Sequence, residues 1–178
     1  SLLVLGLSLA GLQTVQAAES ADVNQPVTFE DGSYPAGLVY GPGQSIWVTL
    51  SGTGEIGQVS GSGTTLHDLT AVDALPSDIT LGPDQSLWFV EENIDRIGRL
   101  TSDGELAEFL LVDRAHPTSI ALGQDLALWF TEREGNRIGR IEPTGALTYF
   151  ELPHADSRPE SIVSAPDGSL WFTDWENR

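Results

Sequence analysis

The pattern of apolar and polar residues runs along the chain as short segments of the kind that form β-strands. These segments are rich in Leu, Ile, Val, Trp, Phe and Thr, and after residue 17 no stretch shows the period of about 3.6 residues that marks an amphipathic helix. One unit begins with expected strands over 159–165 and 169–173, joined by a turn at 166–168. The unit before it ends with expected strands over 136–141 and 146–152, joined by a turn at 143–145. The pattern predicts an all-β fold built from four-stranded antiparallel units.

Three residue patterns recur with a period of 41 or 42 residues. A tryptophan closes a turn-and-strand phrase four times, a proline lies twelve residues ahead of each tryptophan, and an Ile-Gly pair lies nine residues behind three of them. The tryptophans are Trp47, Trp88, Trp129 and Trp171, the prolines are Pro35, Pro76, Pro117 and Pro159, and the pairs begin at Ile56, Ile97 and Ile138. Four short strands in each unit of this length predict the blades of a β-propeller, about four of which lie in this chain.

The repeat also indicates how single residues are used. We expect the four repeat tryptophans to pack between neighbouring blades, and the glycine of each Ile-Gly pair to let a backbone or a Trp ring approach closely. Trp175 lies outside the pattern, where it either packs at an edge or stacks on a ligand. Residues 52–57 have the glycine spacing of a dinucleotide-binding motif, but that motif requires a helix after it, and here another strand is expected.

Charge and composition exclude several partners. The net charge is −18, with eight arginines and no lysine, so the chain repels nucleic acid and anionic membrane surfaces. The absence of cysteine excludes disulfides and thiolate zinc sites.

The N-terminal segment predicts export. An apolar run from Leu2 to Leu12 precedes Val15-Gln16-Ala17, which has small or apolar residues where signal peptidase requires them. We interpret residues 1–17 as the remnant of a signal peptide cleaved after Ala17, and residues 18–178 as a partial propeller domain. The alternative is an uncleaved N-terminal anchor. Cleavage would leave a secreted or periplasmic protein without a membrane contact.

The repeat phrases resemble the virginiamycin B lyase family, also called streptogramin lyases. The resemblance rests on the Trp-Phe phrases at 86–91, 128–132 and 169–174. It is reinforced by the phrases at 95–99 and 136–140, which contain Arg-Ile-Gly-Arg, and by the Pro-x-x-Ile phrases that begin at Pro76, Pro117 and Pro159. It implies a seven-bladed propeller with a small ligand in its central channel. It also implies a C–O lyase that opens a cyclic depsipeptide antibiotic with a histidine base and magnesium held by glutamates.

The resemblance further implies where the reactive residues lie. In the family the active residues are expected in late blades, with the histidine directly after the proline of a Pro-x-x-Ile phrase, at the channel mouth, and a glutamate just before that proline or at the end of the Trp-Phe strand. The positions directly after the repeat prolines hold Ala36, Ser77, Thr118 and Glu160. The positions before the prolines, where the partner glutamate is expected, hold Tyr34, Leu75, His116 and Arg158. Glu160 is the candidate catalytic residue here, with a merely polar role at the mouth as the alternative.

Three carboxylates share the end of the Trp-Phe strand, namely Glu91, Glu132 and Asp174. Such a ring of carboxylates is a candidate site for a hard cation, and the resemblance implies magnesium in the full-length protein. The alternative is that each pairs with an arginine such as Arg96 or Arg137, or faces water. The histidines His67, His116 and His154 occupy unrelated repeat positions and are expected to face solvent.

Three functions therefore stay open for the longer protein. The first is an exported streptogramin-lyase-like enzyme, the second a non-catalytic secreted propeller that binds a ligand or a partner, and the third a lactonase-like hydrolase with a metal-binding set of Glu, Asn and Asp. We also expect residues 27–30 to form an outer strand that completes the last blade of the ring.

Overall fold

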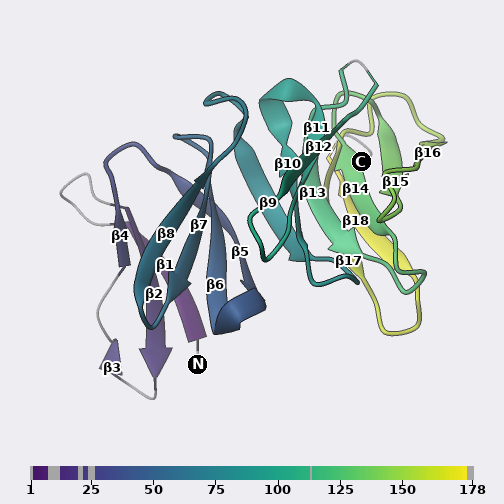
Figure 1. The fold of residues 1–178 in the computed structure, drawn as a ribbon. Helices are drawn as coiled ribbons and strands as arrows, with labels where there is room; N and C mark the ends of the chain where they lie inside the picture. The colour runs from purple at the N-terminus through teal and green to yellow at the C-terminus, as the bar shows by residue number, and fades with distance from the viewer. Residues whose placement is uncertain (1, 8–12, 20–21, 24–26, 113, 176–178) are drawn as a thin grey trace.

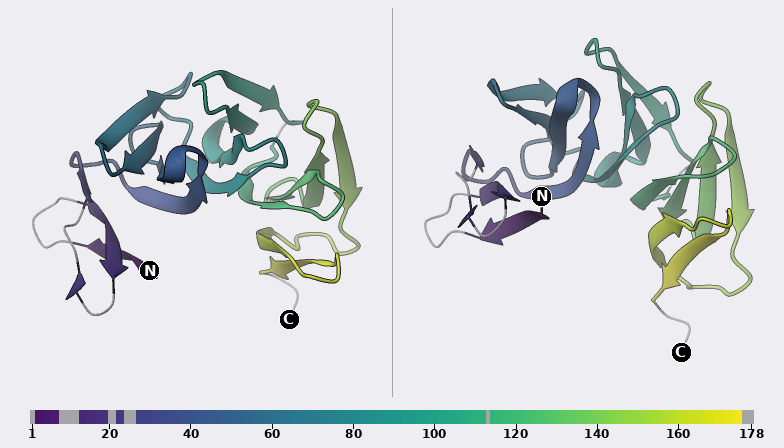
Figure 2. Two further views of the ribbon diagram at one scale, coloured as in Figure 1. Left: turned by 60° about the horizontal axis from the view of Figure 1, so that its bottom comes forward. Right: turned by 90° about the horizontal axis from the view of Figure 1, so that it is seen from below.

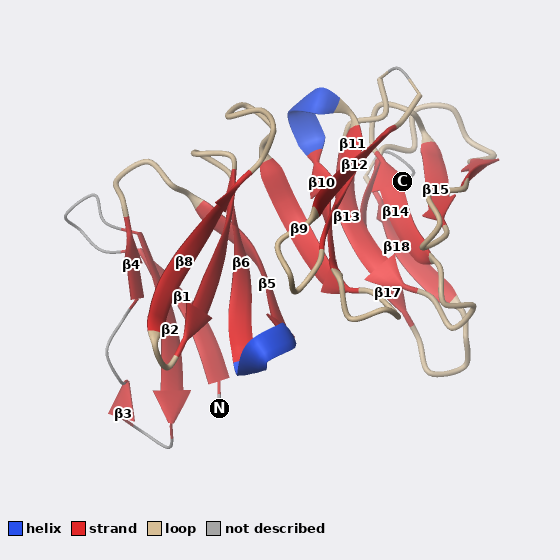
Figure 3. Ribbon diagram, in the orientation of Figure 1, coloured by secondary structure: helices blue, strands red, loops and turns tan. Residues whose placement is uncertain are grey.

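The computed structural model describes residues 2–7, 13–19, 22–23, 27–112 and 114–175 (Figure 1). Within them the chain forms successive antiparallel sheets, and the only helical segments are two 3₁₀ turns, η1 (Pro42–Gln44) and η2 (Glu92–Ile94) (Figure 3). The all-β prediction is thus confirmed. No helix in the described part of the chain is long and apolar enough to cross a membrane.

Three complete four-stranded blades follow one another along the chain. Blade 1 consists of β5 (Pro35–Gly41), β6 (Ser45–Leu50), β7 (Glu55–Ser60) and β8 (Gly63–Asp68). Blade 2 consists of β9 (Pro76–Leu81), β10 (Leu87–Glu91), β11 (Arg96–Leu100) and β12 (Leu106–Leu110). Blade 3 consists of β13 (Pro117–Leu122), β14 (Leu128–Glu132), β15 (Arg137–Ile141) and β16 (Leu147–Glu151). Blade 4 contributes β17 (Pro159–Ser164) and β18 (Leu170–Asp174).

A further sheet precedes blade 1. It contains β1 (Leu2–Leu7), β2 (Gln13–Glu19), β3 (Asp22–Val23) and β4 (Val27–Phe29), and β2 pairs with the other three strands. Residues 27–29 of the strand expected over 27–30 form β4, which pairs with β2 within this chain, and its place in the last blade of a ring stays a prediction. The assignment of residues 1–17 to a signal peptide stays a prediction.

The first strand of each blade forms the inner wall of the assembly. Strand β5 lies beside β9, β9 beside β13, and β13 beside β17, while the other strands extend outward. Figure 2 shows the sheets following one another along an arc whose ends carry the two termini. This arrangement is that of a partial β-propeller.

The Ile-Gly pairs fix the packing inside each blade. Gly98 pairs with Phe89 across the sheet, and Gly139 pairs with Phe130 in the same way. A Cβ atom at Gly98 or Gly139 would lie 2.0 or 2.1 Å from the phenylalanine ring. The expected close approach is confirmed, but the ring belongs to Phe89 or Phe130 and not to the repeat tryptophan, because Trp and Phe are neighbours on one strand and point to opposite faces.

The repeat tryptophans lie in graded environments. Trp47 and Trp88 are buried, whereas Trp129 is half-buried and Trp171 is 65% exposed. The ring of Trp88 stacks on Phe109 with 5.6 Å between centroids and lies under the guanidinium of Arg99. The prediction that all four pack between blades is therefore wrong for Trp171, whose blade has no third or fourth strand among the described residues.

Candidate functional site

Three repeat positions gather at one end of the inner strands, and we call these residues the rim. They are the residue before each repeat proline, the residue after that proline, and the residue that follows the second strand of the blade. Pairing of the proline with the last residue of that strand, as in Pro117 with Glu132, brings the three positions together. The rim residues are Tyr34, Ala36 and Ser51 in blade 1, Leu75, Ser77 and Glu92 in blade 2, His116, Thr118 and Arg133 in blade 3, and Arg158, Glu160 and Trp175 in blade 4.

The backbone before each proline is left-handed. Tyr34, Leu75, His116 and Arg158 have φ between 47° and 53°. A residue before proline ordinarily adopts an extended conformation, so the same unusual geometry in four blades points to a requirement of the local architecture. In blades 1, 2 and 3 its carbonyl accepts the amide of the rim residue after the strand, at 3.2 Å from Arg133 N to His116 O, whereas in blade 4 the amide of Trp175 bonds to the carbonyl of Ser157. The turn thereby holds two rim side chains beside each other.

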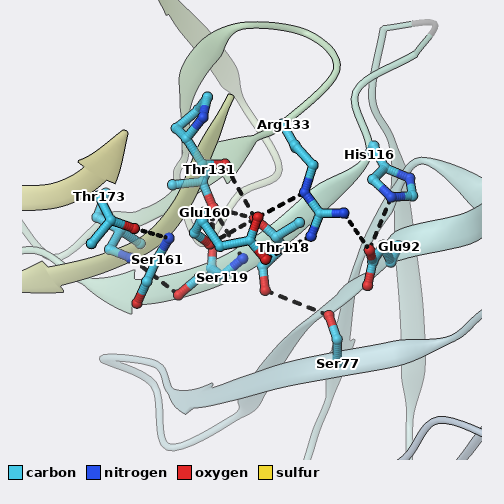
Figure 4. Close-up of polar contacts among 12 residues, drawn as sticks. Ser77, Glu92, His116, Thr118, Ser119, Thr131, Arg133, Glu160, Ser161 and Thr173 are labelled. Atoms are coloured by element: carbon cyan, nitrogen blue, oxygen red, sulfur yellow. Dashed lines mark hydrogen bonds and ion pairs between the residues drawn. The ribbon is translucent and has the colours of Figure 1, made fainter. Parts of the chain in front are cut away.

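An ion-pair network links the rim of blades 2, 3 and 4 (Figure 4). Arg133 donates to both oxygens of Glu160, at 2.7 Å from Nε to Oε2 and 2.6 Å from Nη2 to Oε1. Its Nη1 lies 3.5 Å from Oε1 of Glu92, and that oxygen is 2.9 Å from Nε2 of His116. The hydrogen bond to Glu160 is the main cause that raises the pKa of Arg133 above its ordinary value. Arg133 thus connects three blades.

Glu160, the candidate base, is engaged by this network. Because both carboxylate oxygens accept hydrogen bonds from Arg133, the group is held in place as an anion partner and not as an unpaired base. A cavity of about 250 Å³ opens beside it, lined by Arg133, Arg158, Glu160 and Trp175. Trp175 is 75% exposed, so its ring is available to a ligand at this cavity.

The other predicted mouth positions serve the wall between blades. The hydroxyl of Thr118 donates to the carbonyl of Glu160 at 2.7 Å, and Ser77 lies within 3.5 Å of the carbonyl of Thr118. Thr118 is buried, whereas Ala36 is exposed on β5. The structure therefore brings Ser77, Thr118 and Glu160 together at one end of the inner wall, with Ala36 on the adjoining inner strand.

A second set of hydrogen bonds ties the inner strands together. Asp78 Oδ2 accepts from Ser119 Oγ at 2.8 Å and from the amide of Ile120 at 2.9 Å, both in the next blade. Ser119 Oγ in turn accepts from the amide of Ile162 in blade 4 at 3.2 Å. These amides are freed by the bulge in each Pro-x-x-Ile strand, so a polar side chain of the preceding blade completes the wall.

The three carboxylates proposed for a cation lie in different surroundings. Glu132 is fully buried and accepts a hydrogen bond from Arg137 Nε at 2.7 Å, which confirms the arginine pairing for this residue. Burial nevertheless raises the pKa of Glu132 above its ordinary value, with Arg137 acting in the opposite direction. Asp174 is half-buried at the end of β18.

Glu91 is fully buried, and neither of its oxygens has a hydrogen-bond partner among the described residues. The expected pairing with Arg96 is wrong, because Arg96 forms its ion pair with Glu108 and a hydrogen bond with Thr70. Burial, together with the nearby charge of Glu108, raises the pKa of Glu91 to about 8. In the described part of the chain no three His, Asp or Glu side chains form a metal-ligand group, so we assign no magnesium site to these carboxylates.

The histidines are less exposed than expected. His67 lies on β8 with its ring 5.3 Å from that of Trp47, and burial lowers its pKa. His116 belongs to the rim network, and His154 is the one histidine of the three that is exposed. Sequence reasoning also missed Glu92 and Arg133, although their place directly after the acidic strand end is a repeat position that could have identified them.

Comparison with known proteins agrees with this fold. The sequence model of the virginiamycin B lyase family matches residues 21–178. The crystal structure of selenomethionine-substituted virginiamycin B lyase from Staphylococcus aureus is 34% identical, with a TM-score of 0.87 over 96% of this chain and 62% of that chain. A catalytically inactive histidine-to-alanine variant of that lyase, solved with Quinupristin, gives 34% identity and a TM-score of 0.86, with 96% and 62% of the two chains covered.

More distant structures show the fold alone. A gluconolactonase-like protein, described as putative, is 16% identical with a TM-score of 0.68, over 92% of this chain and 68% of that chain. A comparison with curated protein sequences gives no match. The chain spans about 62% of the length of the lyases it matches. With its repeat phrases, its inner wall and a family match over nearly the whole chain, this protein belongs to the virginiamycin B lyase family.

Proposed function

We propose that the longer protein containing this chain is an exported C–O lyase that opens a cyclic depsipeptide of the streptogramin B type. The observation that carries the proposal is the similarity to the lyase solved with Quinupristin, at 34% identity over 96% of this chain. The rim supports it, because a cavity with an exposed indole and two guanidinium groups offers stacking and hydrogen bonding to a peptide ring.

In this proposal the described blades bind and orient the ligand, and the reacting base lies outside them. Elimination requires a group that removes the proton next to a carbonyl while the ester C–O bond breaks and the carboxylate leaves. The positions where the family places its histidine hold Ala36, Ser77, Thr118 and Glu160, and Glu160 is held by Arg133. The magnesium ion implied by the family would stabilise the developing negative charge, and we assign it no ligand here.

The test is incubation of the protein from the complete gene with Quinupristin and magnesium, followed by mass spectrometry. Elimination gives a linear product of unchanged mass, whereas hydrolysis of the lactone gives a product heavier by one water molecule. We expect the first outcome. The hydrolysed product would support the lactonase-like alternative and contradict the lyase proposal.

A non-catalytic binding protein is the second candidate, favoured by the engagement of Glu160 with Arg133 at the rim. Quinupristin bound without any change in the antibiotic would establish it. The 178-residue chain by itself is expected not to open the antibiotic ring, and turnover by this chain that disappears in Glu160→Gln would show that the base lies in blade 4.

A further inference from the structure

In blades 2 and 3 the repeat forms a cradle for a guanidinium group at the side of the blade, and blade 1 has the same three positions. It is formed by the last residue of the second strand, the first residue of the third strand and one residue of the fourth strand. Registers across the sheets identify these positions as Glu132, Arg137 and Tyr149 in blade 3, as Glu91, Arg96 and Glu108 in blade 2, and as Leu50, Glu55 and Leu66 in blade 1.

In blades 2 and 3 an arginine of the chain itself fills the cradle. Arg137 bonds to Glu132 and lies over the ring of Tyr149, with 5.0 Å from Cζ to the ring centroid. Arg96 forms an ion pair with Glu108 and donates to Thr70 Oγ1 at 3.2 Å. Each guanidinium therefore combines a carboxylate with a neighbouring ring or hydroxyl.

In blade 1 the arginine position of the cradle holds an acid, and a cavity lies beside it. A carboxylate, Glu55, replaces the arginine, and a cavity of about 320 Å³ adjoins it between β4 and blade 1. The cavity has an apolar floor formed by Phe29 and Leu50, which are 5% and 0% exposed, and its wall includes Leu66. Glu30 provides a second carboxylate of the lining.

Among the described residues no arginine lines this cavity. All eight arginines lie at position 96 or later, and the sequence contains no lysine. Among the described residues, the side chains of Glu30 and Glu55 have neither an ion pair nor a hydrogen bond. Asp68, which pairs with Glu55 across the sheet, adds negative charge beside the cavity.

We infer that this cavity binds a small organic cation, an amidinium or guanidinium group carried on an apolar body. The cation bonds to Glu55 as Arg137 bonds to Glu132, and the apolar body covers Phe29 and Leu50 as the aliphatic part of an arginine would. The site lies beside the rim and the inference does not depend on the lyase reaction.

The first test uses the full chain and two probes of the same shape, benzamidine, which is a cation at neutral pH, and neutral benzamide. Titration calorimetry is expected to give benzamidine an affinity about tenfold higher than benzamide, because the amide keeps one NH2 donor but lacks the positive charge and the second nitrogen donor that form a two-point ion pair with a carboxylate. Equal affinities, or no binding of either probe, would overturn the inference, and this comparison requires no amino-acid substitution.

Two substitutions locate the site. Glu55→Gln keeps the size of the side chain and is expected to lower the benzamidine affinity about tenfold. Glu105→Gln, which removes one exposed charge from blade 2, is the matched control and should leave the affinity unchanged. The double substitution Leu50→Glu with Glu55→Arg rebuilds the pair of blade 3, fills the cavity and should abolish binding. Unchanged benzamidine binding in Glu55→Gln or in the double variant would contradict the inference.

Discussion

At the scale of single residues, one repeat position shows how surroundings decide the state of a carboxyl group. Glu91 and Glu132 both end the second strand of a blade and both are fully buried. Arg137 pairs with Glu132, because the fourth-strand position equivalent to Glu108 holds Tyr149, and the acid at the end of that strand, Glu151, lies 3.9 Å from Arg137 Nη1. In blade 2 the fourth strand carries Glu108, and Arg96 forms its ion pair with Glu108 instead of Glu91. Glu91 is therefore a buried carboxyl group without a hydrogen-bond partner among the described residues, and ionising it lowers the free energy of unfolding.

Glu91→Gln is expected to stabilise the protein at neutral and alkaline pH. The pKa of Glu91 is raised from 4.5 to about 8 in the folded state, so the unfolded chain loses the proton first and the free energy of unfolding falls as the pH rises between these values. Glutamine stays neutral and removes that loss, on the order of 5 kcal/mol above pH 8 and little near pH 4.5. Urea unfolding across this pH range measures the difference.

The matched control is Glu132→Gln, which leaves the half-buried Arg137 without its main carboxylate and should destabilise the protein at neutral pH by about 3 kcal/mol. Equal pH profiles for Glu91→Gln and the unsubstituted protein would show that Glu91 is ionised in the folded state.

Arg133→Gln is expected to weaken Quinupristin binding by the longer protein about tenfold or more, because Glu160 then loses the bidentate partner that positions it at the rim. Calorimetric titration measures the affinity, and Arg140→Gln, on a face away from the rim cavity, is the control. An affinity that falls equally in both variants would point to a general loss of structure.

At the scale of elements, the packing of each blade depends on close contact between its second and third strands. The phenylalanine ring of the Trp-Phe strand lies directly on the glycine of the Ile-Gly pair, and no side chain can occupy that space. The Pro-x-x-Ile strand depends on the neighbouring blade, because its bulge leaves a backbone amide without a partner in its own sheet. Asp78 and Ser119, on the adjoining inner strands, accept hydrogen bonds from these amides.

Gly98→Ala is expected to destabilise the protein by about 2 to 3 kcal/mol, since a methyl group at 2.0 Å from the Phe89 ring forces the strands apart. Gly61→Ala is the matched control, because nothing lies within 4 Å of its added Cβ. Thermal unfolding followed by circular dichroism compares the two. A Gly98→Ala protein as stable as Gly61→Ala would mean that the Phe89 ring moves aside without cost.

Asp78→Ala is expected to lower the free energy of unfolding by about 2 kcal/mol, because the amide of Ile120 and the hydroxyl of Ser119 lose their acceptor in a partly buried wall. Asp78→Asn keeps one acceptor oxygen and should lose less. If denaturant unfolding gives the two variants equal stability, the hydrogen bonds between the blades contribute nothing measurable.

At the scale of the whole molecule, the arc of sheets presents an uncovered face at blade 4. Trp171, Phe172 and Val163 are 65%, 39% and 59% exposed, although the equivalent Trp88 and Phe89 are fully buried in blade 2. In blade 2 the third and fourth strands supply Arg99 and Phe109 over the tryptophan. An apolar face next to an open strand edge favours association.

The chain of residues 18–178 is therefore expected to associate with copies of itself, and Trp171→Gln should reduce that association. Analytical ultracentrifugation over a range of protein concentrations measures the change. A monodisperse monomer with a sharp, reversible thermal transition would contradict this prediction.

The sequence alone determined the propeller architecture, because a period of 41 or 42 residues with fixed Pro, Trp and Ile-Gly positions leaves one way to arrange four strands per unit. The strands over 159–164 and 170–174 lie where the pattern predicts them. Only the tertiary structure decided which charged groups meet, since Arg133, Glu160 and Glu92 come from three blades. The same holds for Arg96, whose choice of Glu108 over Glu91 depends on the geometry across three strands. A repeat pattern records where side chains lie within a blade, whereas ion pairs and cavities depend on how neighbouring blades face each other.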